Sequence, residues 1–348
     1  MALLWIDGFD SYGTSTGSAP SPTGVVGRKY STIFAESSMK IRAGRLGGYS
    51  LDIYWNGYII PENLTTDATI VLGAAIMFRN LIENNVSFLR FMDGALNGFG
   101  VRIMSDGELA VCDGAGTQKK ITTGLGLVAN VWYYIEFKVV VNNTTGSYNL
   151  RVAETSVLSD SGLNTRADGG THNYYTTFKV YMPLPSTITT GVDDLYCLDG
   201  SGSVNNDFLG NMRVVTLRPD EAGDSAQFTP DTGSNFARVN EEVCGNDSNY
   251  VEDATTGHED LYNYGALTGI SDNIKGIMVC TDCRETDATS FIIKTVCKPS
   301  TTDRPDAGQS VGSTSYVTKR RILETNPDGT DPWDVTSINA AQFGVQVG

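Results

Sequence analysis

The stretch VWYYIEFKVVV (residues 131–141), followed by NNTTGSYNLRV (residues 142–152), decides the fold of this chain. Apolar and polar side chains alternate along 131–141, and Tyr148, Leu150 and Val152 resume the alternation after the turn at 143–146. A period of two places one set of side chains on one face of a strand. We therefore predict a long β-hairpin with one face on a core.

Further short β runs surround this hairpin. We predict strands over 69–79, 178–182, 192–198 and 208–217, and a hairpin that turns at Asp106-Gly107. The 38 glycines and the many Thr, Val and Tyr residues suit short strands and tight turns. The sequence indicates an all-β protein.

The hairpin resembles the central hairpin of concanavalin A-like/laminin-G-like domains, in which a Trp-Tyr pair opens a long strand and a Gly turn leads into the returning one. VDDLYCLD (192–199) is similar to a late strand of that family. The resemblance implies an N-terminal jelly-roll β-sandwich, followed by a smaller β-rich domain. We place the sandwich at residues 1–218, a linker at 219–235 and a β-rich virion-attachment or oligomerisation domain at 236–348.

A second resemblance is to virion proteins of tailed bacteriophages that begin with such a domain. It is carried by LWIDGFD (4–10), NDFLGN (206–211), Pro332-Trp333 and INAAQFGVQ (338–346). It implies a peripheral structural component of capsid, neck or tail, assembled in the host cytoplasm and located in the virion. Its implied partners are other virion proteins and copies of itself, with a trimer as first guess. A glycan-binding adhesin for host attachment is the alternative, and a polysaccharide depolymerase is the third.

Charge and hydropathy narrow the set of partners. The net charge is −15, and residues 219–348, with 21 acidic and 9 basic side chains, carry −12 of it. Such a surface repels phosphate backbones, so we expect no nucleic-acid binding. No apolar run reaches the length of a membrane span, and the segment before Asp7 is too short for a secretory signal, so we expect neither membrane insertion nor export.

Three groups of residues are candidate binding sites. Tyr54, Trp55 and Tyr58 could form a glycan platform, since aromatic rings stack on the apolar faces of sugars. Asp199, Asn205 and Asp207 offer oxygen ligands to calcium, although a bare turn explains them as well; no other cofactor is expected. Cys280, Cys283, Cys244 and Cys297 are plain thiols, disulfide partners within or between chains, or metal ligands.

Catalytic groups are scarce in the sequence. His172 and His258 belong to no catalytic motif. Glycoside hydrolysis needs two carboxylates across one groove. Glu136 stands beside Lys138, and Asp193 and Asp194 are adjacent in a predicted strand and so should point to opposite faces. We therefore predict that the chain is not an enzyme.

Overall fold

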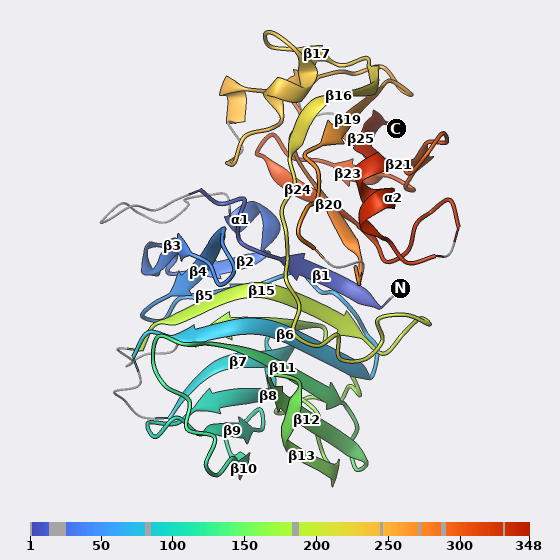
Figure 1. Ribbon diagram of the computed structural model, residues 1–348. Helices are drawn as coiled ribbons and strands as arrows, with labels where there is room; N and C mark the ends of the chain where they lie inside the picture. The colour runs from blue at the N-terminus through green and yellow to red at the C-terminus, as the bar shows by residue number, and fades with distance from the viewer. Residues whose placement is uncertain are drawn as a thin grey trace. The chain divides into compact units, whose positions relative to one another are not determined.

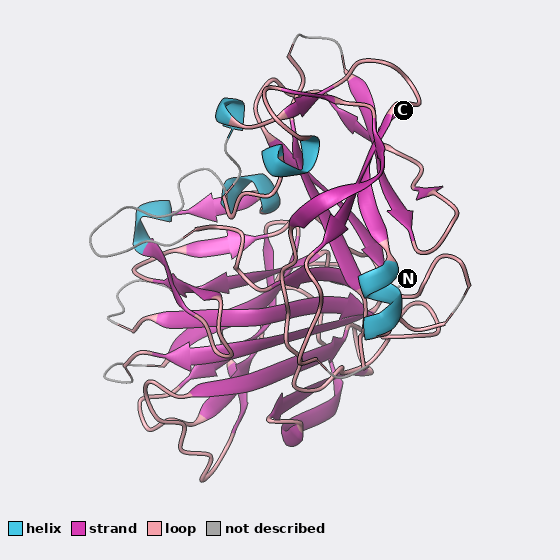
Figure 2. Cartoon of the chain, turned by 45° about the horizontal axis from the view of Figure 1, so that its top comes forward, coloured by secondary structure: helices cyan, strands magenta, loops and turns pink. Residues whose placement is uncertain are grey.

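A computed structural model describes residues 2–13, 26–80, 85–182, 188–243, 246–270, 273–286, 290–329 and 331–348. The chain is 47% strand and 5% helix, which confirms the all-β prediction (Figure 2). It divides into two compact units, Met1–Val215 and Thr216–Gly348. No described helix has the length and apolar character needed to cross a membrane.

The N-terminal unit is a sandwich of two antiparallel sheets (Figure 1). The eight-stranded sheet has, in spatial order, β13 (Thr155–Leu163), β12 (Gly146–Val152), β11 (Trp132–Val140), β6 (Thr69–Phe78), β15 (Thr190–Asp199), β4 (Tyr49–Ile53) and β3 (Met39–Ala43), with β1 (Leu3–Asp7) also paired to β15. The seven-stranded sheet has β10 (Gln118–Ile121), β9 (Leu109–Cys112), β8 (Leu96–Ile103), β7 (Val86–Asp93), β14 (Thr177–Tyr181), β5 (Tyr58–Ile60) and β2 (Thr32–Phe34).

The predicted hairpins are confirmed by the register of the strands. β11 pairs with β12 from Ile135↔Val152 to Val140↔Ser147, and β8 pairs with β9 across the Asp106-Gly107 turn. Alternate residues of β11 enter the core between the sheets, where Phe137 stacks on Phe91 with ring centroids 5.5 Å apart. The sandwich is therefore held by the apolar face that the alternation predicted.

The C-terminal unit is smaller and also built from strands (Figure 1). Its main sheet has β16 (Pro219–Ala226), β19 (Glu259–Tyr264), β25 (Gln342–Val347), β21 (Phe291–Lys298) and β22 (Arg304–Pro305), with β23 (Gln309–Val311) also paired to β21. Two separate pairs are β17 (Thr229–Pro230) with β18 (Val251–Glu252), and β20 (Ile277–Cys283) with β24 (Val317–Leu323). The fully buried Trp333 lies in its core and donates from Nε1 to the Leu323 carbonyl at 3.2 Å.

The helices are short and few among the described residues. The two α-helices are α1 (Val26–Lys29) and α2 (Val335–Ala340), and three 3₁₀ turns lie at Glu36–Ser38, Asn235–Arg238 and Asn246–Ser248. Helix α2 is capped by Asp334, whose side chain accepts from the Ser337 N–H at 2.6 Å.

In two segments the structure differs from the prediction made from the sequence. Residues 219–235 are not a linker: they contribute β16, β17 and the start of a 3₁₀ turn to the C-terminal unit. They looked like a linker because β16 is largely exposed and so carries no apolar alternation. Residues 208–217 form no strand, because several of their backbone N–H groups are bound by side chains instead of a neighbouring strand.

Candidate functional site

The outer face of the eight-stranded sheet carries several polar side chains that the sequence analysis singled out. Along β11, Ile135, Phe137 and Val139 enter the core, so Glu136 and Lys138 point the opposite way. The same alternation places Arg151 of β12 outward, between Leu150 and Val152 of the core. This outer face is therefore where functional groups can gather.

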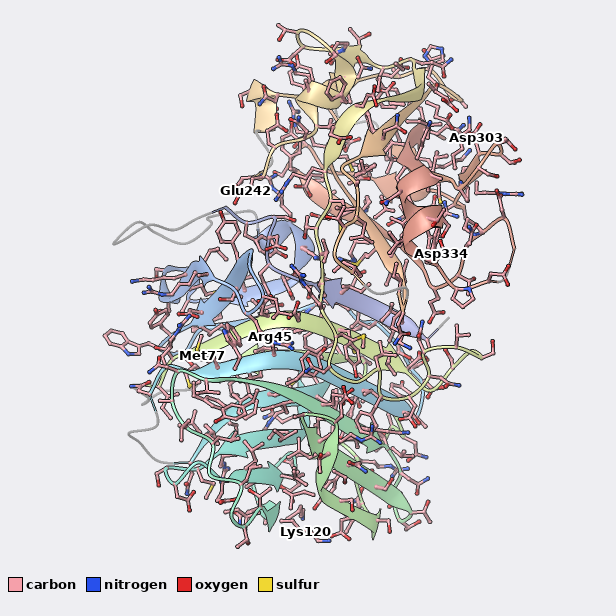
Figure 3. The ribbon with its side chains drawn as sticks, in the orientation of Figure 1. Arg45, Met77, Lys120, Glu242, Asp303 and Asp334 are labelled. Atoms are coloured by element: carbon pink, nitrogen blue, oxygen red, sulfur yellow. The ribbon has the colours of Figure 1, made fainter. Side chains whose placement is uncertain are left out.

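A groove of about 560 Å³ lies over β11, β12 and β13 on this face. Its lining is mainly polar, and the polar residues along the three strands are Lys138, Ser147, Tyr148, Asn149, Arg151, Ser159, Asp160 and Ser161. Lys120, which is labelled in Figure 3, belongs to β10 of the other sheet and does not line the groove; it binds the Ser159 carbonyl at 2.8 Å and the Asp160 carboxylate at 3.3 Å. The groove thus presents hydroxyl, amide and cationic groups side by side.

Asp207 and Phe208 form one wall of this groove. The Arg151 guanidinium lies 3.9 Å from the centre of the Phe208 ring, and Lys138 Nζ lies 3.0 Å from Asp207 Oδ1. Burial opposes ionisation of Asp207, but the hydrogen bonds from the Phe208 N–H and from Lys138 prevail and lower its pKa. An aromatic ring held against a guanidinium gives the wall a fixed position.

Residues 207–214, which we call the strap, continue from this wall across the sheet. The Leu209 N–H donates to the Tyr196 hydroxyl at 3.1 Å, the Gly210 N–H to Glu136 Oε1 at 2.9 Å, and the Val214 N–H to Asp194 Oδ1 at 2.8 Å. Glu136, Asp193 and Asp194 are all buried. The strap therefore binds Glu136 and Asp194, two of the three carboxylates that the sequence singled out as the nearest approach to a catalytic pair.

Asp193 and Asp194 do not point to opposite faces as predicted. The register of β15 against β6 shifts between Asp193 and Tyr196, and Asp194 has φ +50°. This bulge lets both carboxylates reach Arg45, which donates from its N–H to Asp193 Oδ2 at 2.8 Å and from Nη1 to Asp194 Oδ2 at 3.3 Å. Figure 3 labels Arg45 beside β15. Burial, reinforced by Asp194, raises the pKa of Asp193 to about 8.

The three predicted glycan-stacking residues are not brought onto one platform. Trp55 is 63% exposed at the turn after β4. Tyr58 stacks on Phe34 at 5.1 Å on the seven-stranded sheet, with Lys179 Nζ 3.8 Å from its ring centre. Tyr54 instead faces the eight-stranded sheet, where its hydroxyl accepts from Arg42 Nη2 at 3.2 Å.

The predicted calcium ligands make separate contacts. Asp199 accepts from the Thr65 hydroxyl at 2.6 Å and from the Ser201 N–H at 2.9 Å, whereas Asp207 pairs with Lys138. Asn205 lies in the turn between them with φ +52°. Within the described ranges no three His, Cys, Asp or Glu side chains gather to hold a metal ion. The geometry gives the calcium prediction no support.

The cysteines of the C-terminal unit form no disulfide among the described residues. Cys280, Cys283 and Cys297 form no disulfide with one another, and Cys244 lies outside the described residues. Burial raises the pKa of both Cys283 and Cys297 to about 12. An intrachain bond between any two of these three thiols is therefore not formed, and disulfides between chains stay a prediction.

Comparison with known proteins gives a likeness in fold alone. No protein-family model matches the chain, and no curated protein matches it. Among solved structures, domain 4 of the arabinanase AbnA from Geobacillus stearothermophilus, in complex with arabinotriose, matches at 12% identity and a TM-score of 0.34, over 46% of this chain and 75% of that one. Trypanosoma rangeli sialidase matches at 14% identity and 0.35, over 46% of this chain and 27% of that one.

Alginate lyase AlgAT5 of polysaccharide lyase family 7 matches at 10% identity and a TM-score of 0.34, over 48% of this chain and 84% of that one. These proteins are carbohydrate-active. The prediction that the chain is not an enzyme is corrected here: enzymes, namely glycosidases and lyases, are among the structures that resemble it, so a fold of this kind does not exclude catalysis. With TM-scores below 0.5, we transfer none of their activities to the chain.

Proposed function

We propose that the N-terminal unit binds carbohydrate in the groove over β11, β12 and β13. The observation that carries this proposal is the groove itself, about 560 Å³ in volume, with hydrogen-bonding side chains along its strands and Phe208 in its wall. Sugars present many hydroxyls beside apolar C–H faces. Asn149, Ser159 and Arg151 offer donors and acceptors to the hydroxyls, and an aromatic ring packs on the C–H face.

A glycan array followed by calorimetry of the best ligand tests this proposal. Asn149→Ala and Phe208→Ala should each weaken binding by roughly tenfold, since each removes one contact worth about 1.4 kcal/mol. Phe34→Ala is the matched control, because Phe34 is a 45% exposed phenylalanine on the other sheet. If Phe34→Ala weakens glycan binding as much as the groove variants do, or if neither groove variant changes it, the binding site lies outside the groove. Silence across the array would count against carbohydrate binding.

We propose separately, from the sequence motifs alone, that the chain is a peripheral component of a tailed-phage particle. The similarities to solved structures lend this no support. The two proposals are compatible, because a particle component can attach the particle to a host glycan. An image of particles that carry a label on this chain tests the second proposal: density at capsid, neck or tail would support it, and absence of the chain from purified particles would refute it.

A further inference from the structure

A second cluster on the same outer face lies at the opposite edge of the sheet, around β3 and β4. Asp52 of β4 is fully buried and binds two arginines. Arg79, which follows β6, forms a two-pronged pair with it, from Nε to Oδ2 at 3.0 Å and from Nη2 to Oδ1 at 2.9 Å. Arg42 of β3 approaches Asp52 Oδ2 from its Nε at 3.1 Å.

The cluster has more positive than negative charge. Lys40 lies beside Arg42, with Nζ 5.5 Å from the centre of the Tyr54 ring, so three cations surround the single carboxylate of Asp52. The Arg42 and Arg79 side chains are 47% and 29% exposed, whereas Asp52 is 0% exposed. The buried anion therefore orients two guanidinium groups whose surplus charge faces solvent, in a unit whose net charge is negative.

Aromatic side chains flank this pair of arginines. The strand registers place Lys40, Asp52, Gly191, Met77 and Trp132 in one row across β3, β4, β15, β6 and β11. A Cβ on Gly191 would lie 2.9 Å from Asp52 Oδ1 and 3.3 Å from Trp132 Cη2. Because Gly191 has no side chain, the half-buried indole of Trp132 can lie near Asp52 and its arginines. Figure 3 labels Met77, the member of this row on β6.

Tyr54 completes the cluster from the other side. Its hydroxyl accepts from Arg42 Nε at 3.3 Å and from Arg42 Nη2 at 3.2 Å, and it lies 3.4 Å from Asp52 Oδ2. The Arg79 Nη1 group meets the Met77 sulfur at 3.7 Å, which is a weak acceptor. Oriented guanidinium donors with a phenol in contact and an indole in the same row of the sheet combine the two features that a charged sugar needs, a cationic fork and an aromatic face.

We infer that the cluster of Arg42, Arg79, Asp52, Tyr54 and Trp132 binds a carboxylate-bearing sugar of the uronic acid class. The carboxylate would lie on the outward donors of the two guanidinium groups, and the ring would pack against the indole. This inference rests on the proposal that the N-terminal unit binds carbohydrate, and it names the class of sugar that this second site would take. It places Tyr54, one of the residues predicted from the sequence, in a site different from the one predicted.

The test compares two forms of one oligosaccharide, a short oligogalacturonate and its carboxyl-reduced, neutral form, by calorimetry with the full chain. The wild type should bind the acidic form more tightly, with an affinity that falls as salt rises. Arg42→Gln should weaken the acidic form roughly tenfold and leave the neutral form unchanged, because one charged hydrogen bond is lost. Arg79 keeps Asp52 paired in this variant, so the fold is retained.

Two further variants keep the result interpretable. The triple variant Asp52→Asn, Arg42→Gln, Arg79→Gln removes the carboxylate and both guanidinium groups together, leaves Lys40 in place, and should remove most of the preference for the acidic form. Arg102→Gln on β8 of the other sheet is the matched control and should change neither affinity. If the wild type binds the two forms equally, or if Arg42→Gln keeps the preference for the acidic form, this inference is overturned. The proposal that the chain binds carbohydrate would then still stand. Failure of both forms to bind, together with a silent array, would overturn both proposals.

Discussion

The Tyr196 hydroxyl donates a hydrogen bond of 2.5 Å to Glu136 Oε1 beneath the strap. The same oxygen accepts from the Gly210 N–H at 2.9 Å, and the Tyr196 hydroxyl accepts from the Leu209 N–H. One buried carboxylate therefore joins β11, β15 and the strap. Glu136 Oε2 has no hydrogen-bond partner among the described residues, so the first oxygen provides the side chain's polar contacts.

Glu136→Ala should destabilise the N-terminal unit by about 3 kcal/mol, because it opens a cavity and removes the acceptor of the buried Tyr196 hydroxyl and of the partly buried Gly210 N–H. Glu136→Gln should cost about 1 kcal/mol, since its carbonyl can still accept both bonds. Urea unfolding measures both. Glu154→Ala is the matched control: Glu154 also binds the strap, at the Asn211 N–H, but is exposed, so its loss should cost less than about 0.5 kcal/mol. Equal costs in Glu136→Ala and the control would contradict this reading.

The raised pKa of Asp193 makes the stability of the N-terminal unit depend on pH. Burial, and then the neighbouring Asp194, raise the folded-state pKa to about 8, above the ordinary value of 3.8. As the pH rises, Asp193 loses its proton in the unfolded chain before it does so in the folded chain. The stabilisation that the folded state gains from binding this proton more tightly is therefore fully present below about pH 4. It is lost as the pH rises toward 8, by up to ~1.4 kcal/mol per pH unit.

Asp193→Asn should remove this slope between pH 4 and 8. The amide can replace only one of the two acceptor oxygens, which bind the N–H groups of Arg45 and Asp194, so a constant cost of about 1 kcal/mol is expected at every pH. The slope of the free energy of unfolding against pH, and not its value at one pH, is the measurement. The same slope in the variant and the wild type would show that Asp193 titrates normally.

Gly73 of β6 is the residue that admits the Tyr196 ring. A Cβ at this position would lie 2.2 Å from Tyr196 Cε1 and 2.5 Å from Cζ, and the ring cannot move freely because Glu136 and the strap hold its hydroxyl. Gly73→Ala should therefore cost about 2–3 kcal/mol by overpacking. Thermal unfolding measures the loss. In the control Gly27→Ala the nearest atom is 3.7 Å from the new Cβ, and stability should stay near that of the wild type.

The β11–β12 hairpin could be predicted from the sequence because its alternation directly reports which face is buried. The strap could not, since Phe208, Leu209 and Val214 look like strand residues when the side-chain acceptors of their N–H groups are unknown. The bulge at Asp194 leaves no trace in the pattern, so its φ of +50° reversed the predicted direction of a carboxylate. The pairing of Asp52 with Arg79 depends on β15 lying between β4 and β6, which strand order decides.

The N-terminal unit should fold without the rest of the chain, and the strap should be part of what it needs. All strands of its two sheets, and its core from Trp5 to Cys197, lie within Met1–Val215. A fragment of residues 1–215 should therefore unfold cooperatively. A fragment of residues 1–206 retains every strand of this unit but loses the N–H groups that bind Glu136 and Asp194. Two buried carboxylates would then lack the N–H donors of the strap, at a cost of several kcal/mol. Circular dichroism and urea unfolding of both fragments measure the difference.

Equal stability of the two fragments would show that the strap only lies on the sheet. A fragment 1–215 that fails to fold would show that the sandwich depends on the C-terminal unit.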